Sequence, residues 1–138
     1  MRDIELEMKI QKSLNEGNDV WVVGDVHGFN QTLRSLVAKL DIKTGDYVVL
    51  LGDLIDRGPD SYDVIQFVKN SPNMATVKGN HEKMMAKVFS LSRLEKPDLR
   101  ISTWFYNGGL STATSYINAY TDSNGNENTQ ELHQAIER

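Results

Sequence analysis

The sequence predicts an α/β fold built on a parallel β-sheet. Three short apolar runs alternate along the chain with segments whose apolar residues recur at helical spacing. Each of the three runs closes on a glycine that is followed by polar residues. Strands joined by helices run parallel, so the order strand, helix, strand, helix, strand, helix indicates right-handed βαβ units. A length of 138 residues predicts a single domain, 1–138.

The first strand is expected at 20–23, where the run Val-Trp-Val-Val is continuous and rich in β-branched residues. Such a run is typical of a buried strand in a parallel sheet. The preceding segment, 2–15, alternates apolar and charged residues at its start, so both a helix and a strand fit it. A Gly-Asn-Asp break at 17–19 separates this segment from the strand.

Helical segments follow the strands. The segment 31–40 has apolar residues that share one helical face: Leu33, Leu36, Val37 and Leu40. Asn30 is the expected N-cap of this helix, because its side chain can accept a hydrogen bond from the first turn. The remaining strands and helices of the alternating pattern are expected at 47–51, 61–69, 74–77 and 81–94.

The C-terminal third has a less regular pattern. Residues 101–106 are rich in aromatic side chains, and the Asn-Gly-Gly sequence at 107–109 predicts a break or turn. A helix is expected at 110–120, a polar loop at 121–128 and a closing helix at 129–138.

Composition narrows the classes of function. The chain has 15 basic and 19 acidic residues, giving a net charge of −4, which argues against a nucleic-acid partner. Its apolar runs are far shorter than the ~18 residues that a membrane span needs, and the charged start carries no apolar signal core. The absence of cysteine excludes disulfides and thiolate metal sites. We therefore expect a cytoplasmic protein without a membrane partner.

Polar side chains follow each predicted strand. The loops are Gly-Asp-Val-His-Gly at 24–28, Gly-Asp-Leu-Ile-Asp-Arg-Gly at 52–58 and Gly-Asn-His-Glu at 79–82. Carboxyl ends of neighbouring parallel strands meet at one edge of the sheet, where ligands bind. The side chains expected to converge there are Asp25, His27, Asp53, Asn80 and His81. Carboxylate, imidazole and amide groups bind Mn²⁺, Fe²⁺ or Zn²⁺, so the sequence predicts a metal site at this edge.

The three loops together resemble the signatures GDxHG, GDxxDRG and GNHE of the PPP-type calcineurin-like metallophosphoesterases. The later stretch at 104–109, Trp-Phe-Tyr-Asn-Gly-Gly, with Thr112 and Ser115, is similar to a segment of the bacterial and phage (lambda-type) serine/threonine protein phosphatases. The resemblance covers roughly 21–116. It implies an αββα sandwich of two mixed sheets flanked by helices.

The resemblance also implies roles for individual residues. Asp25 and His27 resemble ligands of a first metal ion, Asp53 a bridging carboxylate, and Asn80 a ligand of the second ion that also faces substrate. His81 resembles the general acid, Asp56 its orienting partner and Arg57 a phosphate clamp. The implied cofactors are two divalent ions, manganese first, with iron or zinc as alternatives. The implied reaction is attack on phosphorus by a metal-bridged hydroxide, while His81 protonates the leaving group.

The chain departs from the family pattern after the third loop. The family has two further histidine ligands and a second phosphate-binding arginine, but this sequence has only one more histidine, His133, in a segment expected to be a solvent-facing helix. We therefore expect an incomplete second metal site and an incomplete second sheet, with the C-terminal part of the domain missing. A natural short form and a dimer that supplies ligands in trans are the alternatives. An uncovered sheet would favour self-association.

Three functions are compatible with this pattern. The leading prediction is a phosphomonoesterase acting on phosphoprotein or on small phosphoesters. A dinucleoside-polyphosphate hydrolase, which shares the three motifs, is the alternative enzyme. A metal- or phosphate-binding module without turnover is the alternative outside the enzymes. A plain nucleotide-binding domain fits poorly, because the chain has neither a Gly-x-Gly-x-x-Gly nor a Walker motif.

Overall fold

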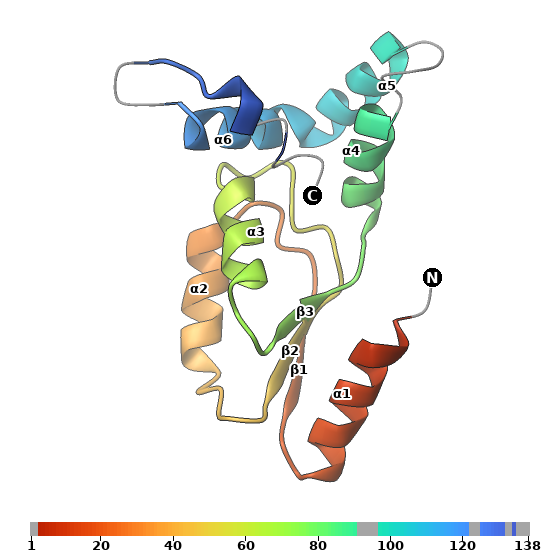
Figure 1. Ribbon diagram of the computed structural model, residues 1–138, viewed down its shortest axis with the longest axis vertical. Coiled ribbons are helices and arrows are strands. Elements are labelled where there is room, and N and C mark those ends of the chain that lie inside the picture. Colours follow the sequence, from red (N-terminus) through yellow and green to blue (C-terminus); the bar gives the residue numbers. More distant parts are fainter. Residues whose placement is uncertain (1–2, 91–96, 122–124, 132–133, 135–138) are drawn as a thin grey trace.

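The computed structural model describes residues 3–90, 97–121, 125–131 and 134. Helices and strands alternate in its first two thirds, and helices follow (Figure 1). The elements are α1 (Ile4–Asn15), β1 (Val20–Val23), α2 (Asn30–Lys39), β2 (Tyr47–Leu50), α3 (Ser61–Lys69), β3 (Met74–Thr76), α4 (Asn80–Ser90), α5 (Pro97–Trp104), a π-helical turn (Phe105–Gly109) and α6 (Leu110–Ala119). The predicted α/β class is confirmed.

The described strands form one parallel sheet in the order β1-β2-β3. In its register Val49 of β2 lies between Val22 of β1 and Ala75 of β3. Since paired residues in a parallel sheet point to the same side, alternate side chains of all three strands share a face. This topology brings the loops after the three strands to one edge of the sheet, as predicted.

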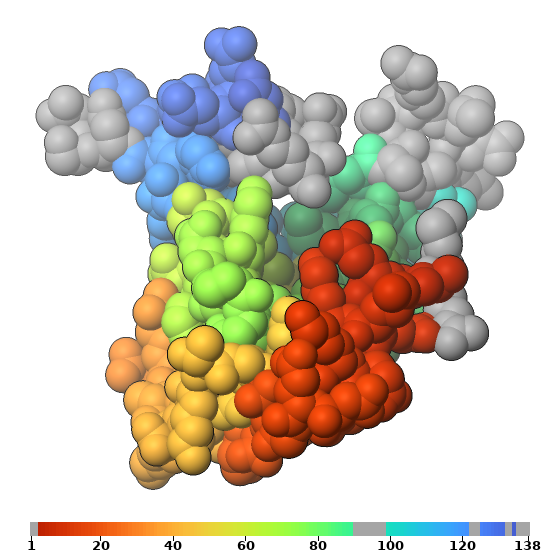
Figure 2. All heavy atoms as spheres, turned by 60° about the horizontal axis from the view of Figure 1, so that its bottom comes forward, coloured from red at the N-terminus to blue at the C-terminus, as the bar shows by residue number. Residues whose placement is uncertain are grey.

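The hydrophobic core lies between one face of this sheet and helices α2 and α3 (Figure 1). Val48 and Leu50 of β2 are fully buried there against Leu33 of α2 and Val64 of α3. Helix α1 lies on the other side of the sheet and forms a separate ridge in the space-filling view (Figure 2). Helices α5 and α6 lie beyond the carboxyl ends of the strands, on the side where the site loops emerge (Figure 1).

Two predictions about the N-terminal elements need correction. The strand at 20–23 was expected to be buried, but Trp21 and Val22 are 37% and 62% exposed. Strand β1 is an edge strand of the described sheet, so its side chains are less covered than those of the central strand β2. Asn30 is not an N-cap: the cap position is Phe29, and the Asn30 side chain accepts a hydrogen bond from Arg34 Nε at 3.1 Å. The ambiguous segment 2–15 forms helix α1, with Asp3 capping it through a hydrogen bond from Leu6 N.

The predicted break at 107–109 is a kink within a continuous helical path. Helix α5 passes through the π-helical turn into α6, and Gly108 has a φ of 103° inside that turn. Because glycine tolerates positive φ, the chain changes direction there without leaving the helical course. The helix expected at 81–94 is described to Ser90, and the helix expected at 129–138 is described only at 129–131 and 134. His133 lies outside the described residues.

Among the described helices, we find none that combines the length and the apolar character needed to cross a membrane.

Candidate active site

Backbone hydrogen bonds join the first two loops directly. The amides of Val26 and His27 donate to the carbonyl of Asp53 at 3.1 and 2.9 Å, and Gly28 N donates to Leu54 O at 2.7 Å. In return, Gly58 N donates to His27 O at 2.9 Å. The two loops therefore form one rigid support on which the site side chains are mounted.

A carboxylate from the third loop completes this support. Glu82, near the start of α4, accepts hydrogen bonds from the amides of Asp53 (2.9 Å), Leu54 (2.8 Å) and Gly79 (2.8 Å). A charged acceptor makes stronger hydrogen bonds than a neutral one. The sequence contained Glu82 in the Gly-Asn-His-Glu motif but predicted no role for it. The structure shows that it ties the second and third loops together.

Several site residues have a left-handed backbone. The φ angles are 49° at His27, 50° at Asp53 and 70° at both Asp56 and Arg57. Residues other than glycine adopt this conformation at an energetic cost, and they cluster at functional sites where the surroundings impose it. Here the hydrogen bonds between the loops hold the backbone in place.

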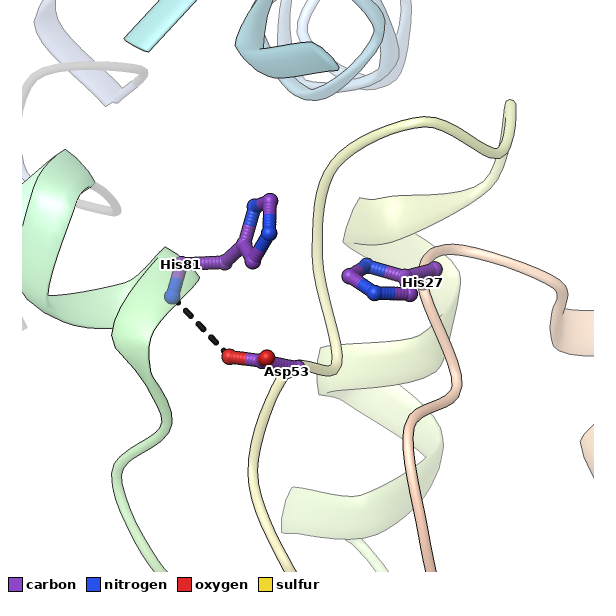
Figure 3. Close-up of side chains that lie close together, drawn as sticks. All are labelled: His27, Asp53 and His81. Carbon is purple, nitrogen blue, oxygen red and sulfur yellow. Dashed lines mark hydrogen bonds between the residues drawn. The ribbon is translucent and has the colours of Figure 1, made fainter. Parts of the chain in front are cut away.

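His27, Asp53 and His81 lie within reach of one metal ion. All three are buried, and one potential ligand atom from each lies within 4.8 Å of the others (Figure 3). His27 Nδ1 donates to the carbonyl of Ile55 at 2.9 Å, which leaves the Nε2 lone pair facing the site. A metal-binding histidine is commonly fixed in this way by its second nitrogen.

The other predicted ligands lie beside this group. The Asp25 carboxylate is 3.5 Å from His27 Nε2 and is largely exposed. Asn80 is exposed at the first position of α4, next to His81. Asp53 Oδ1 accepts a hydrogen bond from the backbone N–H of His81 at 2.9 Å (Figure 3). Oxygen and imidazole donors suit Mn²⁺, Fe²⁺ or Zn²⁺, so His27 and Asp53 fit a divalent ion in their donor chemistry, and the Asp25 carboxylate lies close to the same His27 nitrogen.

His81 and Asp56 form a buried pair. His81 Nδ1 lies 2.7 Å from Asp56 Oδ2, and because a carboxylate accepts, the imidazole N–H donates. The Asp56 side chain is completely inaccessible to solvent. The opposite nitrogen of the imidazole, Nε2, therefore faces the Arg57 guanidinium.

The Arg57 guanidinium lies between the two histidines. Its Nη1 donates to His27 Nε2 at 2.9 Å, and its Nη2 lies 3.3 Å from His81 Nε2. The Arg57 amide donates to the carbonyl of Gly108 at 3.1 Å, in the turn between α5 and α6. The guanidinium thus lies against two of the three side chains that are within reach of one metal ion.

Sequence reasoning missed two residues that contact Asp56. Trp104 Nε1 donates to both carboxylate oxygens at 3.0 and 3.1 Å, and Thr112 Oγ1 donates to Oδ1 at 2.7 Å. Both belong to the segment that resembles the protein phosphatases, and this resemblance was the one indication in the sequence that they have a functional role. Neither contact follows from spacing, because Asp56 is 48 and 56 residues away in the sequence.

Comparison with known proteins identifies the family. Residues 19–135 match the calcineurin-like phosphoesterases. The chain belongs to this family. The resemblance carried by the three loops is thereby confirmed, as is the α/β metallophosphatase class of the fold.

Curated relatives carry two kinds of name. Serine/threonine-protein phosphatase 2 of Escherichia coli (strain K12) is 45% identical over 71 residues, covering 51% of this chain and 32% of the relative. Serine/threonine-protein phosphatase 1 of Salmonella typhimurium is 38% identical over 112 residues, covering 79% and 46%. A symmetrical bis(5'-nucleosyl)-tetraphosphatase of Enterobacter sp. (strain 638) is 39% identical over 84 residues, covering 59% and 30%. The chain thus spans between 30% and 46% of the length of these relatives.

Proposed function

We propose that this calcineurin-like phosphoesterase is a metal-dependent phosphoester hydrolase of the serine/threonine protein phosphatase type. The observation that carries the proposal is the placement of the Asp56–His81 pair and Arg57 against the ligand group His27 and Asp53. An oriented imidazole and a guanidinium beside a metal-binding group are the parts that phosphoester hydrolysis requires.

Each part has a defined task in this proposal. Divalent ions held by Asp25, His27, Asp53 and Asn80, manganese first among them, would activate water and neutralise phosphoryl charge. The Arg57 guanidinium presents two N–H groups that can bind two phosphoryl oxygens together. When His81 is an imidazolium, its Nε2–H can give a proton to the departing oxygen and leave the neutral ring, whose Nδ1–H still donates to Asp56.

The match with a relative named as a protein phosphatase extends over 112 residues, and that with the tetraphosphatase named above over 84. The longer match supports phosphoserine or phosphothreonine as the substrate. A dinucleoside polyphosphate is the second candidate, because several relatives are named for its hydrolysis. The third candidate is a module that binds metal or phosphate without turnover.

Turnover by the purified protein with Mn²⁺ distinguishes these candidates. We expect hydrolysis of a phosphoserine or phosphothreonine peptide, with His81→Asn lowering kcat about 10²- to 10⁴-fold because the leaving alkoxide then receives no proton. Arg57→Ala should raise KM, whereas the matched variant Arg34→Ala, in α2 away from the site, should not. Turnover of diadenosine tetraphosphate alone would favour the second candidate. Metal binding without any turnover would overturn the proposed hydrolase.

A further inference from the structure

The buried carboxylate of Asp56 is held by more than its histidine partner. Oδ2 accepts from His81 Nδ1 and Trp104 Nε1, while Oδ1 accepts from Thr112 Oγ1 and from the same indole N–H. The side chain has no solvent contact, so no water substitutes for a missing donor. A buried carboxylate is stable only when such hydrogen bonds satisfy both of its oxygens.

Thr112 also fixes the backbone of Asp56. Its Oγ1 accepts from Asp56 N at 2.8 Å and lies 2.9 Å from Ser61 Oγ. The single hydroxyl proton of Thr112 points to Asp56 Oδ1, so Ser61 must donate to Thr112. The hydroxyl therefore sets both the position of the Asp56 backbone and the rotation of its carboxylate.

Trp104 and Thr112 contact Asp56 from positions before and after the helix kink. Trp104 ends α5, Thr112 lies in the first turn of α6, and the π-helical turn lies between them. Such turns often occur at functional sites, where they realign side chains. The Gly108 carbonyl in the same turn accepts from Arg57 N, and a Cβ at Gly108 would come within 2.8 Å of that nitrogen.

We infer that Trp104 and Thr112 are positioning residues that act through Asp56 to keep the proton-donating nitrogen of His81 directed into the site. The hydrogen bonds of these two side chains go to Asp56 and Ser61. With both donors present, Asp56 Oδ2 faces His81 Nδ1 and the ring presents Nε2 to the substrate. Without either donor, the carboxylate can rotate, and the imidazole loses the partner that fixes its orientation and its tautomer.

The tautomer of His81 tests this inference without turnover. Long-range ¹H–¹⁵N spectra of the metal-free protein, taken at one alkaline pH, report whether the proton is on Nδ1 or Nε2. We expect the Nδ1–H form in the wild type and a mixture in Trp104→Phe and Thr112→Val. Thr112→Ser, which keeps the hydroxyl, should retain the wild-type form. The matched controls Trp21→Phe and Thr114→Val, both at exposed positions, should do the same.

The result that would overturn the inference is an unchanged His81 tautomer in folded Trp104→Phe and Thr112→Val. Circular dichroism verifies folding. If one of these variants fails to fold, the other decides, and if both fail, a tautomer mixture in Thr112→Ser, which keeps the donor, would count against the inference.

A second readout rests on the proposed function. A phosphoserine peptide releases an alkoxide, which needs a proton, whereas p-nitrophenyl phosphate releases a phenolate, which needs little help. Thr112→Val should therefore lower kcat about tenfold more for the peptide than for the aryl ester, with KM unchanged. Equal losses on both substrates would indicate a merely structural role. If the wild type hydrolyses neither substrate, the proposed function fails, and the tautomer measurement still decides the inference.

Discussion

At the scale of single residues, Arg57 and a metal ion compete for the same lone pair. The guanidinium donates a hydrogen bond to His27 Nε2 at 2.9 Å. A metal ion bound to His27 would need the same nitrogen, because Nδ1 donates its hydrogen bond to the carbonyl of Ile55. Metal binding therefore requires the Arg57 side chain to move away. Since Arg57 is exposed, a swing toward incoming phosphate is sterically open to it.

This competition predicts the effect of removing the guanidinium. Arg57→Ala should tighten Mn²⁺ binding by roughly fivefold, since one hydrogen bond of about 1 kcal/mol no longer has to be broken. Titration calorimetry measures the Kd, and Arg34→Ala is the matched control. Weaker Mn²⁺ binding in Arg57→Ala would show that the arginine supports the metal site instead of competing for it.

The predictability of the site residues depended on how each one is positioned. Asp53, His27 and His81 follow strands, so the parallel order alone predicted that they would meet. Trp104 and Thr112 reach Asp56 through the packing of a kinked helix, which no local pattern encodes. The complete burial of Asp56 likewise follows from that packing and from no local pattern.

At the scale of elements, Asp46 connects the starts of β1 and β2 through hydrogen bonds. Its carboxylate accepts from Asp19 N, just before β1, and from Lys43 N, each at 2.9 Å. The backbone hydrogen bond from Lys43, followed by that from Asp19, lowers the pKa of this carboxyl below its ordinary value. A folded-state pKa below the unfolded one means that the stabilisation is present above the unfolded pKa and is lost as the pH falls through the folded pKa.

Thermal unfolding as a function of pH tests this role. The wild type should lose Tm as the pH falls below about 4, and Asp46→Asn should have a lower Tm at neutral pH and a smaller acid-dependent loss. Asp41→Asn is the matched control, because Asp41 is exposed and its φ of 48° suits asparagine equally well. Parallel pH profiles for Asp46→Asn and wild type would contradict the assignment.

Element boundaries were predictable where burial pattern and turn residues agreed. The helix at 61–69 coincides with α3 because Val64 and Val68 form a buried face and a turn follows. The segment 2–15 was ambiguous because most of its apolar side chains are exposed. Without a buried face, the spacing of its apolar residues does not distinguish a helix from a strand. The Asn-Gly-Gly sequence at 107–109 predicted a break or turn, because nothing in it indicates that helical hydrogen bonding continues beyond Gly108.

At the scale of the whole molecule, one sheet face is left partly uncovered. Leu51 and Val77 continue the strand ladders through hydrogen bonds to Val23 O and Leu50 O, so they share a face with Val22 and Val49. Val22, Leu51 and Val77 are 62%, 54% and 45% exposed. Helix α1 covers this side only in part. Adjacent exposed apolar side chains on a sheet favour association.

We propose that a second copy of the chain covers this face. The exposed strand side chains of this face, Val22, Leu51 and Val77, are aliphatic, so pairing of two copies would remove apolar surface from water. Sedimentation velocity should show a mass that rises with concentration and returns to that of the monomer in Val22→Lys. Met8→Lys, at an exposed apolar position on α1, should still associate. A wild-type chain that stays monomeric at every concentration would contradict this proposal.

The family explains why the fold was predictable from local motifs, yet the second sheet of the implied sandwich is not among the described residues. The chain spans 32% and 46% of the length of the two protein phosphatases. The parallel order of the strands and the three loops that follow them could be predicted, whereas the exposure of β1 could not. The partner layer and the further histidine ligands could not be located from patterns within these residues.

The central claim is that the loops after the three strands bind a catalytic metal, and the most direct test is calorimetric titration of metal-stripped protein with Mn²⁺. We predict that the wild type binds about one ion tightly per chain. His27→Ala and Asp53→Asn should each lose this binding. Asp63→Asn, at an exposed position on α3, should retain it. Absence of binding by the wild type, or binding that both site variants retain, would contradict the claim.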